Sequence, residues 1–426
     1  MTRTFLEELA WRGLLFQHTE GAPQALAGTG ITGYCGFDPT GSSLHIGHLL
    51  PVMGLVHLQR AGHYPVALVG GGTGMIGDPS GRSAERNLLT LEQVAENAAA
   101  LRKQLERFLD FSGAYAARMR NNADWLMSLR LVDFLRDTGK HFSINQMMAR
   151  DSVKSRLETG ISYTEFSYML LQAYDFLELN RRDGVTLQLG GSDQWGNITA
   201  GTELLRKHAG VEAHGVTLPL VTNADGSKFG KTAAGTSVWL DATRTSPYRF
   251  YQSWINADDR DAGRYLRMFT LLEREAIEAL DAAQGAHPER REAQGALAMD
   301  VTTRVHGAAA AEAAREASRV VFDRKVDPRG LSEAVLAMLW DELPRTTLPD
   351  DGAALPVLDV LVATGLVKSR GDGRRQLQQG AVTVNGRKLA ADEVEVPRGD
   401  ALAGGYFLVR KGGREVALAR GGGASA

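Results

Sequence analysis

Three short apolar runs, each followed by glycines and polar residues, constrain the fold of this chain more than any other feature. The runs cover residues 31–37, 66–69 and 185–189. Each has the length and the apolar content of a buried strand, and a stretch with helical spacing of apolar residues follows it. Strands that alternate with helices are joined by crossovers and lie in a parallel sheet. We therefore expect an α/β fold that binds ligands at the carboxyl ends of its strands.

Length and composition set wider limits. A chain of 426 residues is too long for one compact core, so we expect about two to four domains. The net charge of −2 argues against a chain that is basic throughout, although a nearly neutral total can conceal one basic domain. Cys35 is the only cysteine, which excludes an intramolecular disulfide and fits a cytoplasmic protein. Residues 1–21 are typical of an amphipathic helix, no run is long enough to span a bilayer, and we expect no membrane association.

Two histidines, His45 and His48, follow the first strand. Ser42 or Ser43 can cap a helix there, which places both histidines near its first turn, where free N–H groups and the helix dipole favour an anion. Neutral imidazoles can donate hydrogen bonds to phosphate oxygens, and Gly47 between them lets a nucleotide approach the backbone. The cluster predicts an ATP site.

A metal pair or ordinary surface histidines are the alternative interpretations of this cluster. No Cys, Asp or Glu cluster at ligand spacing lies beside the histidines in the sequence, although a distant residue could supply a ligand. We therefore expect no structural metal bound by the protein.

A glycine-containing loop with two lysines, Lys228 and Lys231, lies about 180 residues further along the chain. Lysines at this spacing can follow the β- and γ-phosphates of ATP and neutralise the charge that builds up as pyrophosphate leaves. Together with the histidines, the loop suggests transfer of an adenylyl group.

The second strand is followed by Gly72, Gly74 and Gly77, which have the spacing of a dinucleotide-binding fingerprint. A true fingerprint opens a helix at its last glycine. Here a turn follows, and the next helix is expected at Thr90, where Gln93 completes a capping box. The glycines are better explained by the close approach of some other ligand to the end of this strand.

Three charged residues, Asp78, Arg82 and Arg86, come after these glycines. We expect Asp78 to present a carboxylate in the crevice at the end of the sheet. The two arginines could reach a polyphosphate, or they could be ordinary surface arginines.

A polar stripe runs along a predicted helix over residues 163–179. Tyr168, Gln172 and Asp175 are spaced i, i+4 and i+7, so they share one face of a helix that is otherwise apolar. If the stripe faces inward, these groups need partners, and a polar ligand could supply them. If it faces outward, it is a solvated surface.

The third strand leads into a glycine-rich polar segment, residues 190–197. Asp193 is placed to accept hydrogen bonds from ribose hydroxyls, and Gln194 could bond a carboxylate or an amide of a second substrate. A purely structural turn is the alternative.

The C-terminal part of the chain differs in composition. Residues 246–327 are rich in Ala, Glu, Arg and Leu and predict a helical domain, which by composition alone could equally serve packing or dimerisation. Residues 328–354 are expected to form a linker around one short helix. The last segment, 355–426, holds a basic patch that suggests RNA binding, unless it is only a solvated face. Its basic residues are Lys368, Arg370, Arg374, Arg375, Arg387 and Lys388.

The order of these motifs resembles that of the bacterial tyrosyl-tRNA synthetases, a family of class I aminoacyl-tRNA synthetases, over essentially the whole chain. The resemblance rests on residues 34–40, the histidine cluster, residues 77–80, the Tyr168 helix, residues 190–197 and the lysine loop. It departs from the class pattern Lys-Met-Ser-Lys-Ser, which appears here as Lys-Phe-Gly-Lys-Thr, and Arg82 stands where many relatives have lysine.

The resemblance implies roles for individual residues. Tyrosine contacts are implied for Tyr34, Asp78, Tyr168, Gln172, Asp175 and Gln194. ATP contacts are implied for Gly36, Asp38, Thr40, His45, His48, Gly191, Asp193 and Lys231. The catalytic set would be Thr40, His45, His48, Arg82, Arg86, Lys228 and Lys231.

The resemblance also implies an organisation. A Rossmann-like catalytic domain would occupy residues 1–225, with a helical insertion at about 125–160 that forms a homodimer, and residues 226–245 would carry the lysine loop. The helical domain 246–327 would recognise tRNA near the anticodon, and residues 355–426 would form an S4-like α+β domain that binds RNA. The partners would be L-tyrosine, ATP with Mg²⁺, and tRNA(Tyr).

Three rival classes of protein share some of these features. A nucleotidylyltransferase for a small acid would share the histidines but has no use for a basic C-terminal region. A tryptophanyl relative would need no acceptor for a phenol, which speaks against it because Tyr34 and Asp175 are present. A non-catalytic RNA-binding relative would tolerate loss of the lysine loop, which is present here.

Overall fold

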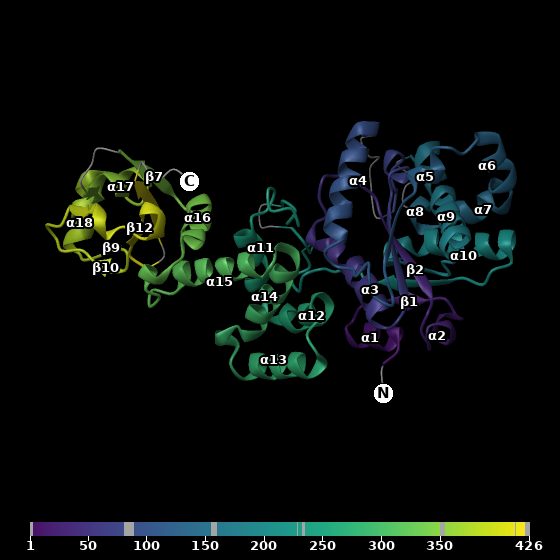
Figure 1. The fold of residues 1–426 in the computed structure, drawn as a ribbon, viewed down its shortest axis with the longest axis horizontal. Helices are drawn as coiled ribbons and strands as arrows, with labels where there is room; N and C mark the ends of the chain where they lie inside the picture. The colour runs from purple at the N-terminus through teal and green to yellow at the C-terminus, as the bar shows by residue number, and fades with distance from the viewer. Residues whose placement is uncertain are drawn as a thin grey trace. The chain divides into compact units, whose positions relative to one another are not determined.

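The computed structural model describes residues 3–80, 89–154, 160–227, 229–231, 235–349, 354–413 and 415–421. The chain forms two compact units (Figure 1). The first comprises residues 1–245 and 256–305, and the second comprises residues 246–255 and 306–426. Within the described ranges, no helix is both long and apolar enough to cross a membrane.

A six-stranded sheet forms the centre of the first unit (Figure 1). In spatial order its strands are β1 (Gln17–His18), β6 (His214–Leu218), β5 (Leu187–Gly191), β2 (Thr32–Phe37), β3 (Tyr64–Val69) and β4 (Arg118–Asn121). All neighbours from β6 to β4 pair in parallel, and only β1 runs antiparallel to its neighbour β6. The apolar runs in the sequence predicted β2, β3 and β5, and the expected parallel α/β fold is confirmed.

Helices connect these strands and extend the unit. They are α1 (Phe5–Trp11), α2 (Ala22–Ala25), α3 (Leu49–Arg60), α4 (Leu91–Leu105), α5 (Ala123–Leu126), α6 (Leu131–Asp137), α7 (Ile144–Met148), α8 (Asp151–Lys154), α9 (Tyr163–Asp183), α10 (Trp195–Ala209), α12 (Asp259–Phe269), α13 (Arg274–Ala286) and α14 (Glu292–His306). The short helices α5 to α8 lie between β4 and α9, where the sequence predicted a helical insertion.

Successive residues of β2 show which helices cover which face of the sheet. Gly33 and Tyr34 point to opposite faces, because side chains alternate along a strand. The Tyr34 ring meets the Phe176 ring of α9 edge-on at 5.2 Å. A Cβ at Gly33 would lie 2.8 Å from Leu58 of α3. Helix α9, together with α10, therefore covers one face, and α3 covers the other.

Local sequence signals set the ends of two of these helices. The capping box expected at α4 is present: the Thr90 hydroxyl accepts from the Gln93 N–H at 3.2 Å, and the Gln93 side chain accepts from the Thr90 N–H at 3.0 Å. Helix α9 ends at Asp183, and the residue that caps it, Gly184, has a left-handed φ of 67°, which suits a residue without a side chain.

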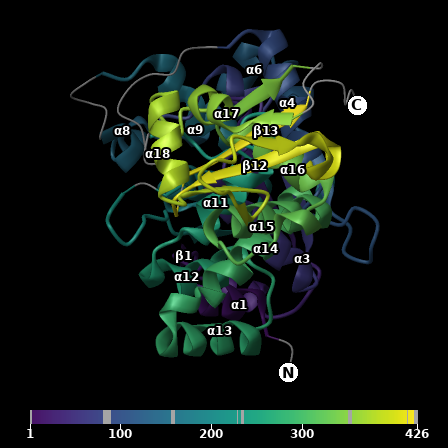
Figure 2. The same ribbon diagram turned by 90° about the vertical axis from the view of Figure 1, so that its left-hand side faces the viewer.

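The second unit is a small α+β structure around a five-stranded sheet with the order β10-β9-β12-β13-β7 (Figure 2). Its strands are β7 (Arg345–Leu348), β8 (Ala354–Pro356), β9 (Val382–Val384), β10 (Arg387–Lys388), β11 (Glu395–Pro397), β12 (Tyr406–Lys411) and β13 (Glu415–Gly421). Its helices are α11 (Pro247–Ile255), α15 (Ala308–Phe322), α16 (Glu333–Glu342), α17 (Val357–Ala363) and α18 (Arg370–Gln378).

The segment expected to be a linker, 328–354, is mostly part of this folded unit. Helix α16 buries Val335, Leu336 and Leu339 in its core, and β7 pairs in parallel with β13. Pro344 lies between α16 and β7, and Pro349 follows β7, so these prolines interrupt the elements without preventing them; Asp350 and Asp351 lie outside the described residues. The helical region 246–327 is also divided, with 256–305 in the first unit and the remainder in the second.

Candidate active site

A cleft of about 430 Å³ opens where β2, β3 and β5 end. Its walls come from the segments after these three strands and from one face of α9, so residues far apart in the sequence meet there. The predicted site residues that line it are Tyr34, Gly36, Asp38, Thr40, His45, His48, Asp78, Tyr168, Gln172, Asp175, Gly191, Asp193 and Gln194. Lys231 is not part of the lining, and Arg82, Arg86 and Lys228 lie outside the described residues.

Asp175 and Tyr34 form the deep end of the cleft. The Asp175 carboxylate is 2% exposed and accepts hydrogen bonds from the Asn122 amide and the Trp125 indole, each at 2.8 Å. The Tyr34 hydroxyl is buried, and no group in the described part of the chain forms a hydrogen bond with it. A ligand hydroxyl placed here would satisfy a buried group that otherwise lacks a partner.

Burial controls the protonation of Asp175 and Tyr34 at the deep end of the cleft. It raises the pKa of Asp175 to about 8, although the bonds from Asn122 and Trp125 act in the opposite direction. Burial, and then the proximity of Asp175, also raise the pKa of the Tyr34 phenol well above its ordinary value. The phenol therefore stays protonated and available as a hydrogen-bond donor.

Polar groups along the middle of the cleft hold one another in place. The Tyr168 hydroxyl donates to Asp38 at 2.9 Å, and the Gln194 amide donates to Asp78 at 2.7 Å. Asn197 donates to Gln172 at 3.1 Å. Tyr168 and Asp175 are buried, so the polar stripe of α9 faces inward, as the first of the two sequence interpretations required.

Asp38 has more contacts within the protein than the sequence suggested. Its carboxylate accepts from the hydroxyls of both Tyr168 and Thr73, the latter at 2.7 Å. Thr73 in turn accepts from Asn122 at 2.9 Å, and Asn122 donates to Asp175. A continuous chain of hydrogen bonds therefore joins the middle of the cleft to its deep end.

The two histidines stand at the other end of the cleft. The main-chain N–H of Gly47 donates to Nδ1 of His45, and the N–H of His45 donates to Nδ1 of His48, both at 3.1 Å. Because each Nδ1 is an acceptor, the proton of each neutral ring lies on Nε2. Burial, and then the charge of Lys231, lower the pKa of His45 to about 4, so its ring is neutral near pH 7.

The helix after this cluster begins later than the sequence suggested. Ser42 or Ser43 was expected to cap it, but residues 46–48 form a 3₁₀ turn that His45 caps, and α3 starts at Leu49. A Cβ at Gly47 would lie 2.9 Å from the His45 ring, so a larger residue at this position would displace that ring. The Ser43 hydroxyl instead donates to the Leu44 carbonyl at 2.7 Å.

The lysine loop packs directly against the histidine turn. Gly230 has a φ of 84°, and a Cβ there would lie 3.2 Å from Ile46 and 3.6 Å from the backbone nitrogen of Gly47. Phe229 lines the cleft, and the Lys231 ammonium donates to the Ser237 hydroxyl at 2.9 Å. The two motifs that are remote in the sequence are therefore neighbours in the fold.

Sequence reasoning missed several residues of this site, among them Asn122, Trp125 and Cys35. Asn122 and Trp125 follow β4 and hold the Asp175 carboxylate, but no motif marks them. Cys35 lines the cleft beside Tyr34, and burial raises the pKa of its thiol to about 12. The glycine at 36 was expected, and a Cβ there would meet no atom within 4 Å, which leaves room for a ligand against the backbone.

The basic patch predicted for RNA lies on the second unit, around α18 and the β9–β10 hairpin. Several of its charges are paired: Arg370 with Asp359, Arg375 with Asp372 at 2.7 Å, and Arg387 with Glu393 at 2.6 Å. Arg374 is exposed, and no ion pair to it occurs within the described ranges. The patch is therefore less positive than its sequence implies.

Two models of known protein families match this chain. The model of the family "tRNA synthetases class I (W and Y)" matches residues 27–323, and that of the "Tyrosine--tRNA ligase SYY-like C-terminal domain" matches residues 336–419. The chain therefore belongs to the class I tRNA synthetases of the tryptophan and tyrosine type.

Individual relatives narrow the assignment. A tyrosine--tRNA ligase of Anaeromyxobacter dehalogenans is 53% identical over 98% of this chain and 99% of its own length, and that of Geobacillus stearothermophilus is 49% identical over 97% and 99%. A crystal structure of a C-terminally truncated mitochondrial tyrosyl-tRNA synthetase of Aspergillus nidulans is 30% identical, covering 75% of this chain and 95% of its own, with a TM-score of 0.69. Within the class, the chain falls among the tyrosine--tRNA ligases.

Proposed function

We propose that this chain activates L-tyrosine with ATP and transfers the tyrosyl group to the 3′-terminal ribose of tRNA(Tyr), releasing pyrophosphate and AMP. The observation that carries this proposal is the buried Tyr34 hydroxyl, which has no hydrogen-bond partner in the described part of the chain and lies near Asp175, whose side chain is held by Asn122 and Trp125. A phenol hydroxyl can bond to both groups, whereas phenylalanine would leave them unsatisfied. Tyrosyl-tRNA synthetases are themselves the well-known case of this discrimination, in which a site that bonds a hydroxyl rejects the analogue without it.

The amino acid would lie along the cleft. Its ammonium group would bind Asp78, Tyr168 and Gln172, which lie in the middle of the cleft, and Gln194 would contact it from the segment after β5. Asp38 would assist indirectly, because its bond with the Tyr168 hydroxyl fixes that phenol. This arrangement directs the tyrosine carboxylate towards the histidine end.

ATP would occupy that end as its Mg²⁺ complex. Asp193 and the backbone of Gly191 would bind the ribose, and Gly36 and Thr40 would allow close approach of the nucleotide. The magnesium enters as part of the substrate, bound mainly by phosphate oxygens and water.

The first step needs no general base, because the tyrosine carboxylate is already ionised. Its oxygen attacks the α-phosphorus, a new carboxyl–phosphate bond forms, and the bond to the β-phosphate breaks with its electron pair leaving on pyrophosphate. Neutral His45 and His48 donate to phosphate oxygens through Nε2, and Lys228 and Lys231, with Arg82 and Arg86, neutralise the departing charge. In the second step the terminal ribose hydroxyl of tRNA attacks the carbonyl carbon of the tyrosyl-adenylate. The new ester bond forms as the carboxyl–phosphate bond breaks, AMP leaves with its electron pair, and the hydroxyl proton passes to the departing phosphate or to solvent.

Transfer requires that tRNA be held. We propose that the helical region 246–327 contacts it near the anticodon and that the C-terminal region 355–426 binds its backbone as an S4-like domain. The candidates for these contacts are Lys368, Arg370, Arg374, Arg375, Arg387 and Lys388. The single cysteine supports a cytoplasmic location.

We also propose that two copies of the chain associate through the insertion at 125–160. Leu131, Val132 and Ile144 of α6 and α7 are 70%, 74% and 62% exposed, which is unusual for large apolar side chains. A second copy would cover them. Leu131→Asp with Val132→Asp should then shift the sedimentation of the protein from dimer to monomer, and an unchanged mass would refute this interface.

The activity is tested by tyrosine-dependent exchange of pyrophosphate into ATP, followed by charging of tRNA(Tyr). Exchange with tyrosine and none with phenylalanine or tryptophan supports the proposal. Asp175→Ala should abolish exchange while the thermal unfolding transition is retained. Exchange by the unaltered protein that does not depend on tyrosine would overturn the proposal.

A further inference from the structure

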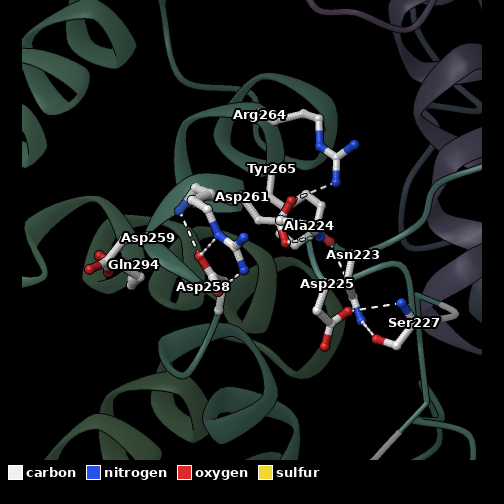
Figure 3. A network of polar contacts seen from close by, with 12 residues as sticks. Asn223, Ala224, Asp225, Ser227, Asp258, Asp259, Asp261, Arg264, Tyr265 and Gln294 are labelled. Atoms are coloured by element: carbon white, nitrogen blue, oxygen red, sulfur yellow. Dashed lines mark hydrogen bonds and ion pairs between the residues drawn. The ribbon is translucent and has the colours of Figure 1, made fainter.

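One face of α12 forms hydrogen bonds with residues 222–224, which lead into the lysine loop (Figure 3). The Asp261 carboxylate accepts the main-chain N–H of Ala224 at 2.8 Å, and the Tyr265 hydroxyl donates to the Asn223 side chain at 2.7 Å. Arg264 donates to the Thr222 carbonyl at 2.5 Å and to Asp261 at 2.6 Å. These contacts come from consecutive turns of one helix, so the segment is held at several points.

The same face of α12 also contacts the lysine loop itself, at Phe229. Phe229, which lies between the two lysines in the sequence and also lines the cleft, stacks on Phe269 with ring centroids 5.0 Å apart and planes 9° apart. It also meets Tyr265 at 5.1 Å. Asp261, Tyr265 and Phe269 are spaced four residues apart, so they form a single line along the helix.

The segment between these contacts is internally fixed. The Asn223 side chain donates to the Ser227 hydroxyl at 2.8 Å, and the Ser227 N–H donates to Asp225 at 2.8 Å. The Asn223 N–H donates to the Ser227 carbonyl at 3.0 Å. A displacement at Asn223 is therefore passed to Ser227, the residue immediately before Lys228.

The polar half of this contact is buried and satisfied. Asp261 and Tyr265 are each 3% exposed, and a buried carboxylate is retained only where donors compensate its loss of water. Burial, and then the proximity of Asp261, raise the pKa of Tyr265 to about 12, which keeps its hydroxyl a donor to Asn223. The contact persists over the whole neutral pH range.

We propose that Asp261, Tyr265 and Phe269 are positioning residues that hold the lysine loop against the pyrophosphate end of the cleft. This inference rests on the proposed function, which assigns the loop its role with pyrophosphate. Lysines on an unrestrained loop would lose conformational entropy each time they engage the leaving group. A loop already held by α12 loses less, so the helix lowers the barrier of the activation step without touching either substrate.

The experiment compares Tyr265→Phe with a matched control, Asp259→Asn. Tyr265→Phe keeps the ring contact with Phe229 and removes only the hydroxyl that binds Asn223. Asp259 lies in the first turn of the same helix, accepts from Gln294 at 2.7 Å and pairs with Arg291 at 3.5 Å (Figure 3). Among the described residues of the loop, none contacts it. Asp259→Asn keeps an acceptor for Gln294 and loses the charge that pairs with Arg291, so each variant weakens one polar interaction of α12 and their melting temperatures should fall by similar amounts.

The kinetic readouts separate positioning from stability. We expect Tyr265→Phe and Asn223→Ala each to lower kcat of tyrosine-dependent exchange by about two- to tenfold, with the KM for tyrosine unchanged. Asn223→Ala also removes the bond from the Asn223 amide to the Ser227 hydroxyl. The double variant should therefore lose no more than Asn223→Ala alone, because that substitution already removes the bond with Tyr265. Asp261→Asn, which keeps an acceptor for the Ala224 N–H, should retain more activity than Asp261→Ala.

A further comparison tests whether the effect acts through the lysines. In a Lys231→Ala background, adding Tyr265→Phe should lower kcat by less than about twofold. An unaltered kcat in Tyr265→Phe, an equal loss in Asp259→Asn, or a full additional loss in the Lys231→Ala background would overturn the inference. If the unaltered chain shows no tyrosine-dependent exchange at all, it is the proposed function that fails.

Discussion

The main-chain N–H of Ile46, in the histidine turn, donates to the carbonyl oxygen of Val238 at 3.0 Å. The N–H of Val238 donates in turn to the carbonyl of Gly230 at 3.1 Å. One residue beyond the lysine loop therefore ties that loop to the histidines through two backbone bonds. Backbone bonds of this kind do not depend on the side chain at Val238. The sequence therefore carries no signal that the histidine turn and the lysine loop are connected.

Gly230→Ala should impair activation through this connection. The φ of 84° at Gly230 is left-handed, and the added methyl would press on Ile46 at 3.2 Å. A left-handed conformation costs a residue with a Cβ about 1–2 kcal/mol, which corresponds to about five- to thirtyfold in a rate. We expect kcat of exchange to fall within that range with an unchanged KM for tyrosine. Gly210→Ala is the control, because φ is 66° and nothing lies within 4 Å of its Cβ; it should lower the melting temperature and leave kcat intact.

Asp175→Asn should change how stability depends on pH. Because burial raises the pKa of Asp175 to about 8, the folded protein keeps this proton between about pH 4 and pH 8, where the unfolded chain has lost it. The free energy of unfolding therefore decreases as the pH rises through this window. Asparagine does not titrate. The melting temperature of the variant minus that of the unaltered protein should therefore increase from pH 5 to pH 8.

The absolute stability of this variant is a separate matter. Its amide NH₂ would face the Asn122 or the Trp125 donor, which adds a cost that does not depend on pH. The difference between the two melting curves is therefore the relevant measurement. Parallel curves across this pH range would show that Asp175 is already ionised in the empty cleft.

His45 should be neutral, with its proton on Nε2, at pH 6. Its Nδ1 accepts the Gly47 N–H, and burial, together with Lys231, lowers its pKa to about 4. Long-range ¹H–¹⁵N spectra of protein labelled on histidine nitrogen measure this state directly. Lys231→Ala should move the titration of His45 to higher pH, because it removes a nearby positive charge. Imidazolium shifts for His45 at pH 6 in the unaltered protein would contradict the expectation.

The sequence predicts the parts of the fold that local patterns encode. Strands β2, β3 and β5 coincide with apolar runs. Thr90 and Gln93, three positions apart, form the capping box that marks the start of α4. The inward face of α9 was one of two open interpretations, because the spacing of Tyr168 and Asp175 defines a face but not its direction. Only packing against the sheet decides that direction.

Other features depend on contacts between distant residues, and the sequence could not reveal them. Asn122 and Trp125 hold Asp175 from about fifty positions earlier in the chain, and nothing around them forms a motif. Strand β7 has only four residues, of which only Leu348 is buried, and it is held in the sheet by pairing with β13 about seventy residues later. Such short edge elements carry too little apolar pattern to be recognised alone.

Arg374 should contribute more to tRNA binding than Arg375. Arg375 is paired with Asp372 at 2.7 Å, so it brings less net charge to a phosphate, whereas Arg374 has no ion pair in the ranges that the structure describes. If Arg374 contacts one phosphate, Arg374→Ala should reduce the slope of log affinity against log salt by about 0.7–0.9, and Arg375→Ala should reduce it by less. The affinity is measured by titrating tRNA(Tyr) at several salt concentrations.

The variant that lacks both arginines separates RNA binding from catalysis. Because neither arginine lines the cleft, this double variant should raise the KM for tRNA in charging while pyrophosphate exchange keeps its rate. Equal losses in charging and exchange would show that these arginines support the fold rather than bind RNA.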